Sequence, residues 1–474
     1  MMRMIQRVRV NICALDVCNF DVNINIVNHL LTIDEISGIL DHSLSCRQLL
    51  EMDQDASIPV HPDLKAYALS LLHDNIPLMQ LRQMCKHWAI QCWGDSQGDN
   101  YHCFCLNQHD PSSLYCKISH ECGIAPATAT EENLDHWLCP DNPVPPNPLL
   151  AQSILYYQAC IEGILDQLII VITTPEMKAT AWQYGHSHHI LLDLTFGFSS
   201  AHANLLIIMA LNEEKTGIPI GLIIFTAKVD AKAVHANYNT QLIKSLLEKW
   251  RKGLGTLDGS EFAFLEPQVA TMDYDTCEHT TLQEIWPSTL LLLCMFHVWQ
   301  CWHNGLNRHL AVVPKGPDRL VIRCHLVKFL MWLLKEITSY SDAIQAYNNQ
   351  IVHFQQLGKK DDRISKLQSR GVLAFLHYLN SYLHVPSLWF AWSMGGIIEA
   401  ASHLKVPVHD IPCTNNHLES FNGRIKLKYF EMYMHGGRLP CIDLWVLLIV
   451  TKVIPDFFQE WADHQVQQAY YVNM

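Results

Sequence analysis

Short apolar runs separated by polar turns occupy the middle of the chain. Three of them, His189–Leu194, Asn204–Leu211 and Ile218–Lys228, have the length and the apolar character of strands. The polar loop Asn212–Gly217 joins the last two runs and ends in glycine, as hairpin loops often do. The pattern therefore predicts three consecutive strands, of which the last two form a hairpin.

Helices and strands alternate after this run. Asn237–Leu254 places its apolar residues on one helical stripe, and Cys277–Trp286 is a second predicted helix. Gln268–Met272 and Leu290–Cys294 are short predicted strands. The order β-β-β-α-β-α-β-α implies an α/β protein with a mixed sheet and helices on its faces. It is the order of a ribonuclease H-like fold, although other mixed α/β folds produce similar strings.

Helical patterns predominate on either side of this core. Leu149–Ile170 is predicted to be a helix, and the N-terminal region before it to be α-rich. The five prolines from Pro140 to Pro148 cannot continue a helix or a central strand, so we place a domain boundary there. The expected parts of the chain are an N-terminal region in 1–150, which could be a degenerate zinc- or DNA-binding module, and a ribonuclease H-like core in 151–310. An all-helical insertion is expected in 311–410, and the last catalytic helix with C-terminal helices in 411–474.

Composition narrows the possible classes of protein. The chain has 474 residues, of which 49% are hydrophobic and 17% charged, so a large core is expected and global disorder is excluded. Its net charge of −13 argues against a surface coated with basic residues, but leaves room for a local basic groove. No apolar run reaches about 18 residues, so we expect no membrane span. No secretory signal pattern is evident, and the 17 cysteines are therefore expected to be reduced thiols or metal ligands.

Three acidic residues stand where such a fold would use them. Asp193 is a single charge inside an apolar strand, Asp273 ends the next predicted strand, and Glu419 lies on a predicted helix. Carboxylates from two strands and a helix can together hold two divalent cations, which suit phosphodiester chemistry. Hard oxygen ligands favour Mg²⁺ or Mn²⁺.

Each acid also has a purely structural interpretation. Asp193 could be a turn or edge residue, and Asp273 could form a turn while Asp275 acts as the ligand. Glu419 follows Asn416 by three residues, the spacing of a capping box at a helix start.

Two further sets of residues are candidates for binding. Lys426 and Asn422 share a polar helical stripe with Glu419 and could contact a DNA phosphate. Arg424 points elsewhere on the helix and is a weaker candidate. The alternative is that these residues form a solvated basic face. Cys294 and His297 share one face of a helix start, so they could bind a second metal or contact DNA, or simply pack. Zinc is considered for a cluster whose spacing matches no standard finger: Cys103, Cys105, His109, Cys116, His120 and Cys122.

These segments resemble, in order, the catalytic domain of Mutator-like element (MULE) DNA transposases. The matching segments are Ala181–His186 with Ile190–Gly197, Gly217–Phe225, Met272–Glu278 with Trp286–Pro287, Leu293–His297 with its Cys-x-x-His motif, and Thr414–Asn422 with Lys426. The stretch Asp110–Trp137 is similar to the upstream region of fungal copies. The resemblance covers roughly residues 110–465, and the 146 residues between Asp273 and Glu419 leave room for the helical insertion of that family.

The resemblance implies a nuclear enzyme that cuts and joins DNA. Asp193, Asp273 and Glu419 would form its acidic triad with two Mg²⁺ or Mn²⁺ ions, acting on transposon ends and target DNA; self-association is left open. No clear zinc module precedes the domain, no short Cys/His zinc motif follows it, and no import signal is visible. The chain could therefore be a decayed copy of such a transposase. The alternatives are a domesticated, non-catalytic DNA-binding transcriptional regulator derived from a transposase, and a plain metal-dependent nuclease.

Overall fold

The computed structural model describes most of the chain in two compact units, which divide at Leu114. The described residues are 4–11, 19–27, 30–38, 60–74, 76, 78–94, 106, 110–121, 124, 129–141, 143–160, 167–200, 203–227, 240–257, 263–273, 276–430 and 439–472. The proline-rich stretch near residue 150, where the sequence suggested a boundary, lies inside the second unit.

The first unit begins with a three-stranded antiparallel sheet. Its strands β1 (Met4–Asn11), β2 (Asn19–Val27) and β3 (Leu30–Gly38) pair in chain order. The prediction of an α-rich N-terminal region is wrong for these residues. In β2 apolar residues alternate with Asp21, Asn23 and Asn25, and this period of two is typical of a strand.

Helices follow in the rest of the N-terminal region, as predicted. They are α2 (Pro62–His73), α3 (Leu78–Trp93), α4 (Asp110–Glu121) and α5 (Thr130–Leu138). Helices α2 and α3 pack together through fully buried leucines that include Leu64, Leu72 and Leu81. Helix α5 belongs to the second unit, where it packs on α17 (Ile442–Leu448).

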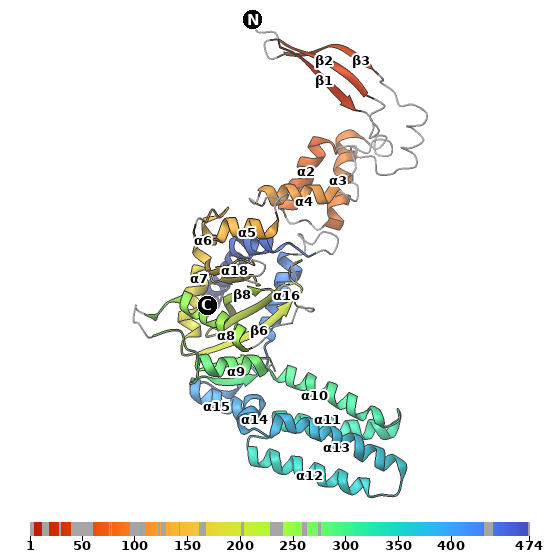
Figure 1. The fold of residues 1–474 in the computed structure, drawn as a ribbon, viewed down its shortest axis with the longest axis vertical. Helices are drawn as coiled ribbons and strands as arrows, with labels where there is room; N and C mark the ends of the chain where they lie inside the picture. The colour runs from red at the N-terminus through yellow and green to blue at the C-terminus, as the bar shows by residue number, and fades with distance from the viewer. Residues whose placement is uncertain are drawn as a thin grey trace. The chain divides into compact units, whose positions relative to one another are not determined.

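A seven-stranded mixed sheet forms the centre of the second unit (Figure 1). Its order is β10-β9-β6-β7-β8-β5-β4, with β6, β9 and β10 parallel and the other pairs antiparallel. The strands span Ile154–Gln158 (β4), Ile169–Ile172 (β5), His189–Phe196 (β6), Asn204–Leu211 (β7), Gly217–Phe225 (β8), Val269–Met272 (β9) and Leu290–Leu293 (β10). Strands β7 and β8 are buried along their whole length, which matches their continuous apolar sequences. The structure thus confirms a mixed α/β protein.

The prediction of one helix over Leu149–Ile170 is wrong. A short helix α6 (Pro148–Ser153) leads directly into β4, and β5 starts at Ile169. The β-branched run Ile169–Ile172 pairs with β8 on one side and β4 on the other. Short apolar runs cannot be assigned to helix or strand by periodicity alone, and here the pairing partner decides.

Helix α8 (Thr240–Leu254) lies against β4, β5 and β8 and buries Trp250, and α9 (Thr276–Ile285) packs beside α8 and against β10. Short helical turns, α7 (Pro175–Thr180) and the π-helix η3 (Ala181–Gly185), connect β5 to β6.

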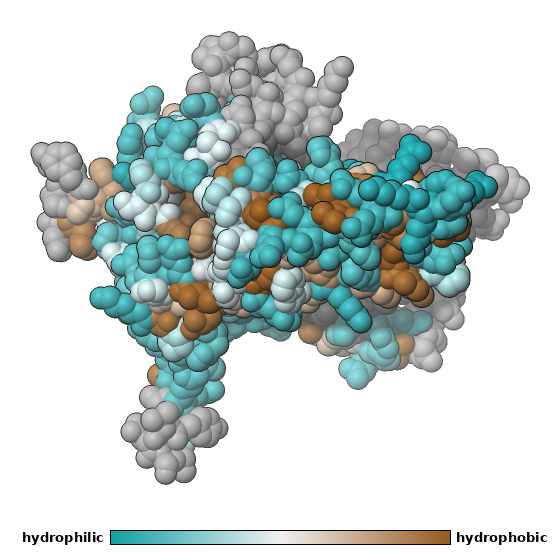
Figure 2. Space-filling model, turned by 90° about the horizontal axis from the view of Figure 1, so that it is seen from below, coloured by the Kyte–Doolittle hydropathy of each residue, from teal (hydrophilic) through white to brown (hydrophobic). Residues whose placement is uncertain are grey.

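The expected helical region follows β10. It consists of α10 (Met295–His309), the 3₁₀ turn η5 (Leu310–Val312), α11 (Pro317–Lys335), α12 (Tyr340–Gly358), α13 (Arg363–Leu383), α14 (Pro386–Trp392) and α15 (Met394–Leu404). The ring of Trp302 packs edge-on against those of Trp392 and Tyr382 in its core. Figure 2 shows apolar side chains interspersed with hydrophilic ones on the face seen from below, and Leu320, Val321 and Trp332 are among the exposed apolar residues of this region.

The chain then returns to the sheet. Helix α15 packs on β9 and β10, and the backbone N–H of Met295 donates to the carbonyl of Cys413. After the 3₁₀ turn η6 (Val408–Asp410) come α16 (Asn416–Arg424), the π-helix η7 (Ile425–Tyr429), α17, the π-helix η10 (Ile449–Val453) and α18 (Ile454–Val472). None of the helices among the described residues is long and apolar enough to cross a membrane.

Candidate functional site

Asp193 and Asp273 lie side by side at the carboxyl ends of two parallel strands. Strands β6 and β9 pair in parallel with Leu191 opposite Thr271, so the register continued by two residues places Asp193 opposite Asp273. Residues two apart point to the same face of a sheet, so both side chains emerge on one face. Asp193 is buried, with 7% of its surface exposed.

Helix α16 brings Glu419 to the same place. The helix packs against β6 through an amphipathic pattern in which Leu418 and Phe421 are buried and Glu419 is exposed. It begins at Asn416 with Asn415 as its N-cap, and no cap hydrogen bond from a side chain is present. Asn416 is therefore inside the helix, and the capping-box alternative for Glu419 is not what the structure shows.

The raised pKa of Asp193 indicates that the three acids lie close together. Burial, followed by the neighbouring carboxylate of Asp273, raises the pKa of Asp193 to about 7; Glu419 adds to this rise and His297 opposes it. The three acids chosen from the sequence, from segments far apart in the chain, thus share one local field. Crowded carboxylate oxygens of this kind are hard donors, and a divalent cation such as Mg²⁺ or Mn²⁺ would relieve their repulsion. The donor set fits such an ion.

His297 faces Asp273 from the start of α10. Its Nδ1 lies 2.7 Å from Asp273 Oδ1, and this carboxylate, together with Cys294, raises the pKa of His297 to about 10. The His297 ring therefore carries a positive charge at neutral pH. The sequence grouped His297 with Cys294, and the structure adds Asp273 to them.

Asn415 is a site residue that the sequence reasoning missed. It is fully buried, and its Nδ2 donates to Asp273 Oδ1 at 2.7 Å while its Oδ1 accepts from the thiol of Cys294 at 3.1 Å. On the helix itself, Asn422 Nδ2 lies 3.5 Å from Asp193 Oδ2. The only sequence signal for Asn415 is its place before the Glu419 helix, because its partners lie more than 100 residues away in the chain.

Among the described residues, one group of three metal-ligand side chains has its ligand atoms within 4.8 Å of one another. It consists of Asp273, Cys294 and His297 and not of the three acids, so these three residues could hold an ion. The Cys294 thiol, however, already donates to Asn415.

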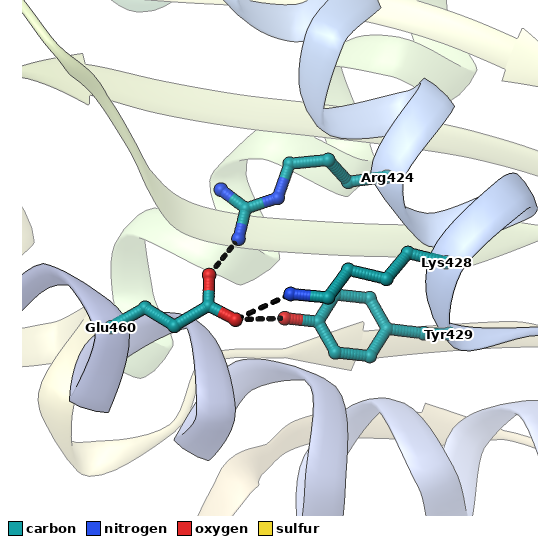
Figure 3. Close-up of polar contacts among 4 residues, drawn as sticks. All are labelled: Arg424, Lys428, Tyr429 and Glu460. Carbon is teal, nitrogen blue, oxygen red and sulfur yellow. Dashed lines mark hydrogen bonds and ion pairs between the residues drawn. The ribbon is translucent and has the colours of Figure 1, made fainter. Parts of the chain in front are cut away.

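The basic residues after Glu419 are engaged with the protein itself. The Lys426 amine donates to the carbonyl of Phe196 at 3.0 Å and to Thr195 Oγ1 at 3.4 Å, at the end of β6. Arg424 and Lys428 both donate to Glu460 of α18, where Tyr429 is a third donor (Figure 3). Lys426 therefore stays near the site, whereas Arg424 ties two helices together.

The remaining candidates are not brought to this site by the described structure. Cys116 and His120 are exposed and stand four residues apart on α4. Asp275 and four members of the N-terminal cluster, Cys103, Cys105, His109 and Cys122, lie outside the described residues. Zinc binding by that cluster and the Asp275 alternative stay predictions.

Comparison with known proteins leaves the chain without an assigned family. No protein-family model matches it, and no curated protein matches it either.

Proposed function

We propose that this protein is a metal-dependent transposase that cuts and joins DNA through Asp193, Asp273 and Glu419. The observation that carries the proposal is the meeting of these three acids, from β6, β9 and α16, with Asp193 so crowded that its pKa rises to about 7. A buried carboxylate whose pKa is raised by two neighbouring acids marks a functional site more often than a structural one.

The order of the strands supports a ribonuclease H-like fold for the core. Strands β8, β7 and β6 form an antiparallel meander, and β9 and β10 extend it in parallel beyond β6. Strands β5 and β4 add to the opposite edge. Within the series β6 to β10, the first strand, β6, is therefore the neighbour of the fourth, β9. Asp193 lies on β6, and Asp273 directly follows β9.

The chain's own residues provide a binding face for a phosphodiester. Asp193, Asp273 and Glu419 would hold Mg²⁺ or Mn²⁺, which would activate water or a 3′-hydroxyl and stabilise the leaving oxygen. His297 and Asn415 hold the Asp273 carboxylate from one side. Lys426, on η7 directly after α16, holds this segment against the end of β6, beside the place where a DNA phosphate would lie.

The wider expectations belong to the same proposal. The substrates are transposon ends and target DNA, and the site of action is the nucleus. These follow from the MULE resemblance of the sequence motifs.

A DNA nicking and joining assay tests the proposal. We expect the purified full chain with Mn²⁺ to nick or join DNA, and we expect Asp193→Asn and Glu419→Gln each to lower the rate by at least about 1,000-fold, since each removes a ligand charge. The matched control is Asp410→Asn, an acid outside the site that faces Lys215. Equal activity in Asp193→Asn and the wild type would contradict the proposal, and DNA binding without any cleavage would favour the regulator instead.

A further inference from the structure

Two asparagines contact the two strand aspartates from either end of the Glu419 helix. Asn415 precedes α16 and Asn422 lies seven residues later, which is about two helical turns, so both face the same side as Glu419. Asn415 donates to Asp273 and Asn422 to Asp193. Each aspartate thus has its own amide partner, and Glu419 stands between the two amides.

The orientation of Asn415 is determined by its surroundings. Its NH₂ group faces the Asp273 carboxylate and its carbonyl oxygen faces the Cys294 thiol. A flipped amide would set oxygen against carboxylate and leave both contacts repulsive or lost. Because the side chain is fully buried, no water can substitute for these partners without a rearrangement.

The amide contacts each reach one oxygen of an aspartate. Asp273 Oδ1 receives both Asn415 Nδ2 and His297 Nδ1. Asp193 Oδ2 faces Asn422 Nδ2, and this contact of 3.5 Å is longer than that made by Asn415. The two carboxylates also lie within hydrogen-bonding reach of each other, so the amides orient a pair of aspartates that share one place.

We propose that Asn415 and Asn422 are positioning residues that align the Glu419 helix with Asp193 and Asp273 so that both carboxylates face a shared divalent cation. This inference rests on the proposed function. Cys294 acts in it as a hydrogen-bond donor that orients Asn415, and not as a ligand of an ion of its own. Partners behind a ligand commonly change metal affinity by 10- to 100-fold when they are removed.

The test measures Mn²⁺ binding to the purified full chain by electron paramagnetic resonance, without DNA. We expect Asn415→Ala to weaken binding on the order of 10- to 100-fold, and Asn422→Ala to weaken it by less, because its contact is longer. Asn416→Ala is the matched control, since this neighbouring asparagine is exposed, and it should bind as the wild type does. Cys294→Ser keeps a donor for Asn415 and should also retain affinity, whereas Cys294→Ala should lower it.

The possible outcomes distinguish a failure of the positioning role from a failure of the proposed function. Failure of the wild type to bind Mn²⁺ would overturn the proposed function itself. Binding by the wild type that is unchanged in both Asn415→Ala and Asn422→Ala would overturn only the positioning role. A stoichiometric zinc that disappears in Cys294→Ser would also overturn it, because Asp273, Cys294 and His297 would then form a metal centre of their own. Should Asn415→Ala fail to fold, Asn422→Ala and Cys294→Ala decide the question.

Discussion

Individual charged residues in this protein are placed at a cost in stability. Asp193 is buried beside Asp273, and its raised pKa shows that the ionised form is destabilised in the metal-free chain. The Asn415 amide and the charged His297 ring offset part of that cost at Asp273. Such unfavourable placement is expected where a cation completes the site.

A second buried group governs the response of the fold to acid. His189 begins β6, is buried, and shares a hydrogen bond of 2.8 Å between its Nε2 and Thr271 Oγ1. Burial, aided by the nearby Lys215 and His417, lowers the pKa of His189 from 6.5 to about 3. Between pH 6.5 and about 3, the His189 side chain of the unfolded chain therefore binds a proton that the folded chain does not.

The resulting prediction concerns stability between pH 7.5 and 5. As the pH falls below 6.5, the unfolded state gains a proton at His189 and the fold loses stability, by about 2 kcal/mol at pH 5. His189→Leu should remove this part of the acid-induced loss, as measured by urea unfolding at both pH values. His377→Leu, at an exposed histidine, should leave it unchanged. An identical loss in His189→Leu and the wild type would show that His189 does not titrate in this way.

At the scale of elements, α16 is held from both sides. Its polar face contacts β6 and β9 through Asn422 and the preceding Asn415, and its far side joins α18 through Glu460 and through the edge-on pair of Phe421 and Phe457. The helix that carries Glu419 is therefore fixed between the sheet and the last helix.

We expect Glu460→Gln to loosen this outer attachment. Three donors meet at Glu460, which is partly exposed, so the loss should be about 1 kcal/mol at pH 7. Lys428 and then Arg424 lower the pKa of Glu460, so the stabilisation is present above its ordinary value of 4.5 and is lost as the pH falls through the lowered pKa. Urea unfolding at pH 7 and pH 3.5 measures both effects.

Asp361→Asn is the comparison for this variant, because Asp361 is fully exposed and pairs with the exposed Lys366. Its effect should be close to zero at either pH. A loss in Glu460→Gln that is equally large at pH 3.5 would mean that packing, and not charge, attaches α18.

The contact between α8 and the sheet depends on a glycine. A Cβ on Gly221 of β8 would overlap Nε1 of the buried Trp250, which donates to Thr173. Gly221→Ala should therefore cost about 1–3 kcal/mol in the free energy of unfolding. Gly423→Ala is the control: it meets no atom within 4 Å in α16 and should stabilise that helix by roughly 0.5–1 kcal/mol. No difference between the two variants would contradict the packing described here.

Which elements could be predicted from the sequence follows from their physical signals. Strands β6, β7, β9 and β10 were predicted to within about two residues, because each is an apolar run bounded by polar or glycine residues. Strand β8 ends at Phe225, three residues before the predicted end. Strands β4 and β5 were mistaken for a helix, because only pairing with β8 distinguishes the two states there.

At the scale of the whole molecule, the candidate site joins three distant parts of the chain. Asp193 and Asp273 are 80 residues apart, and the helical region of residues 311–410 separates both from Glu419. The identities of the three acids could be chosen from the sequence, since each is a charge in an apolar or helical setting. Asn415 could not, because its contacts with Asp273 and Cys294 arise only when the chain returns to the sheet after α15.

The most direct measurement asks whether these three segments share one bound cation. Fe²⁺ bound in place of Mg²⁺, with ascorbate and peroxide, produces radicals that cut the backbone beside the ion. We expect fragments that end near residues 193, 273 and 419, suppressed by excess Mg²⁺ and absent in Asp193→Asn. Cutting at only one of the three segments, or a pattern unchanged in Asp193→Asn, would contradict a shared carboxylate site.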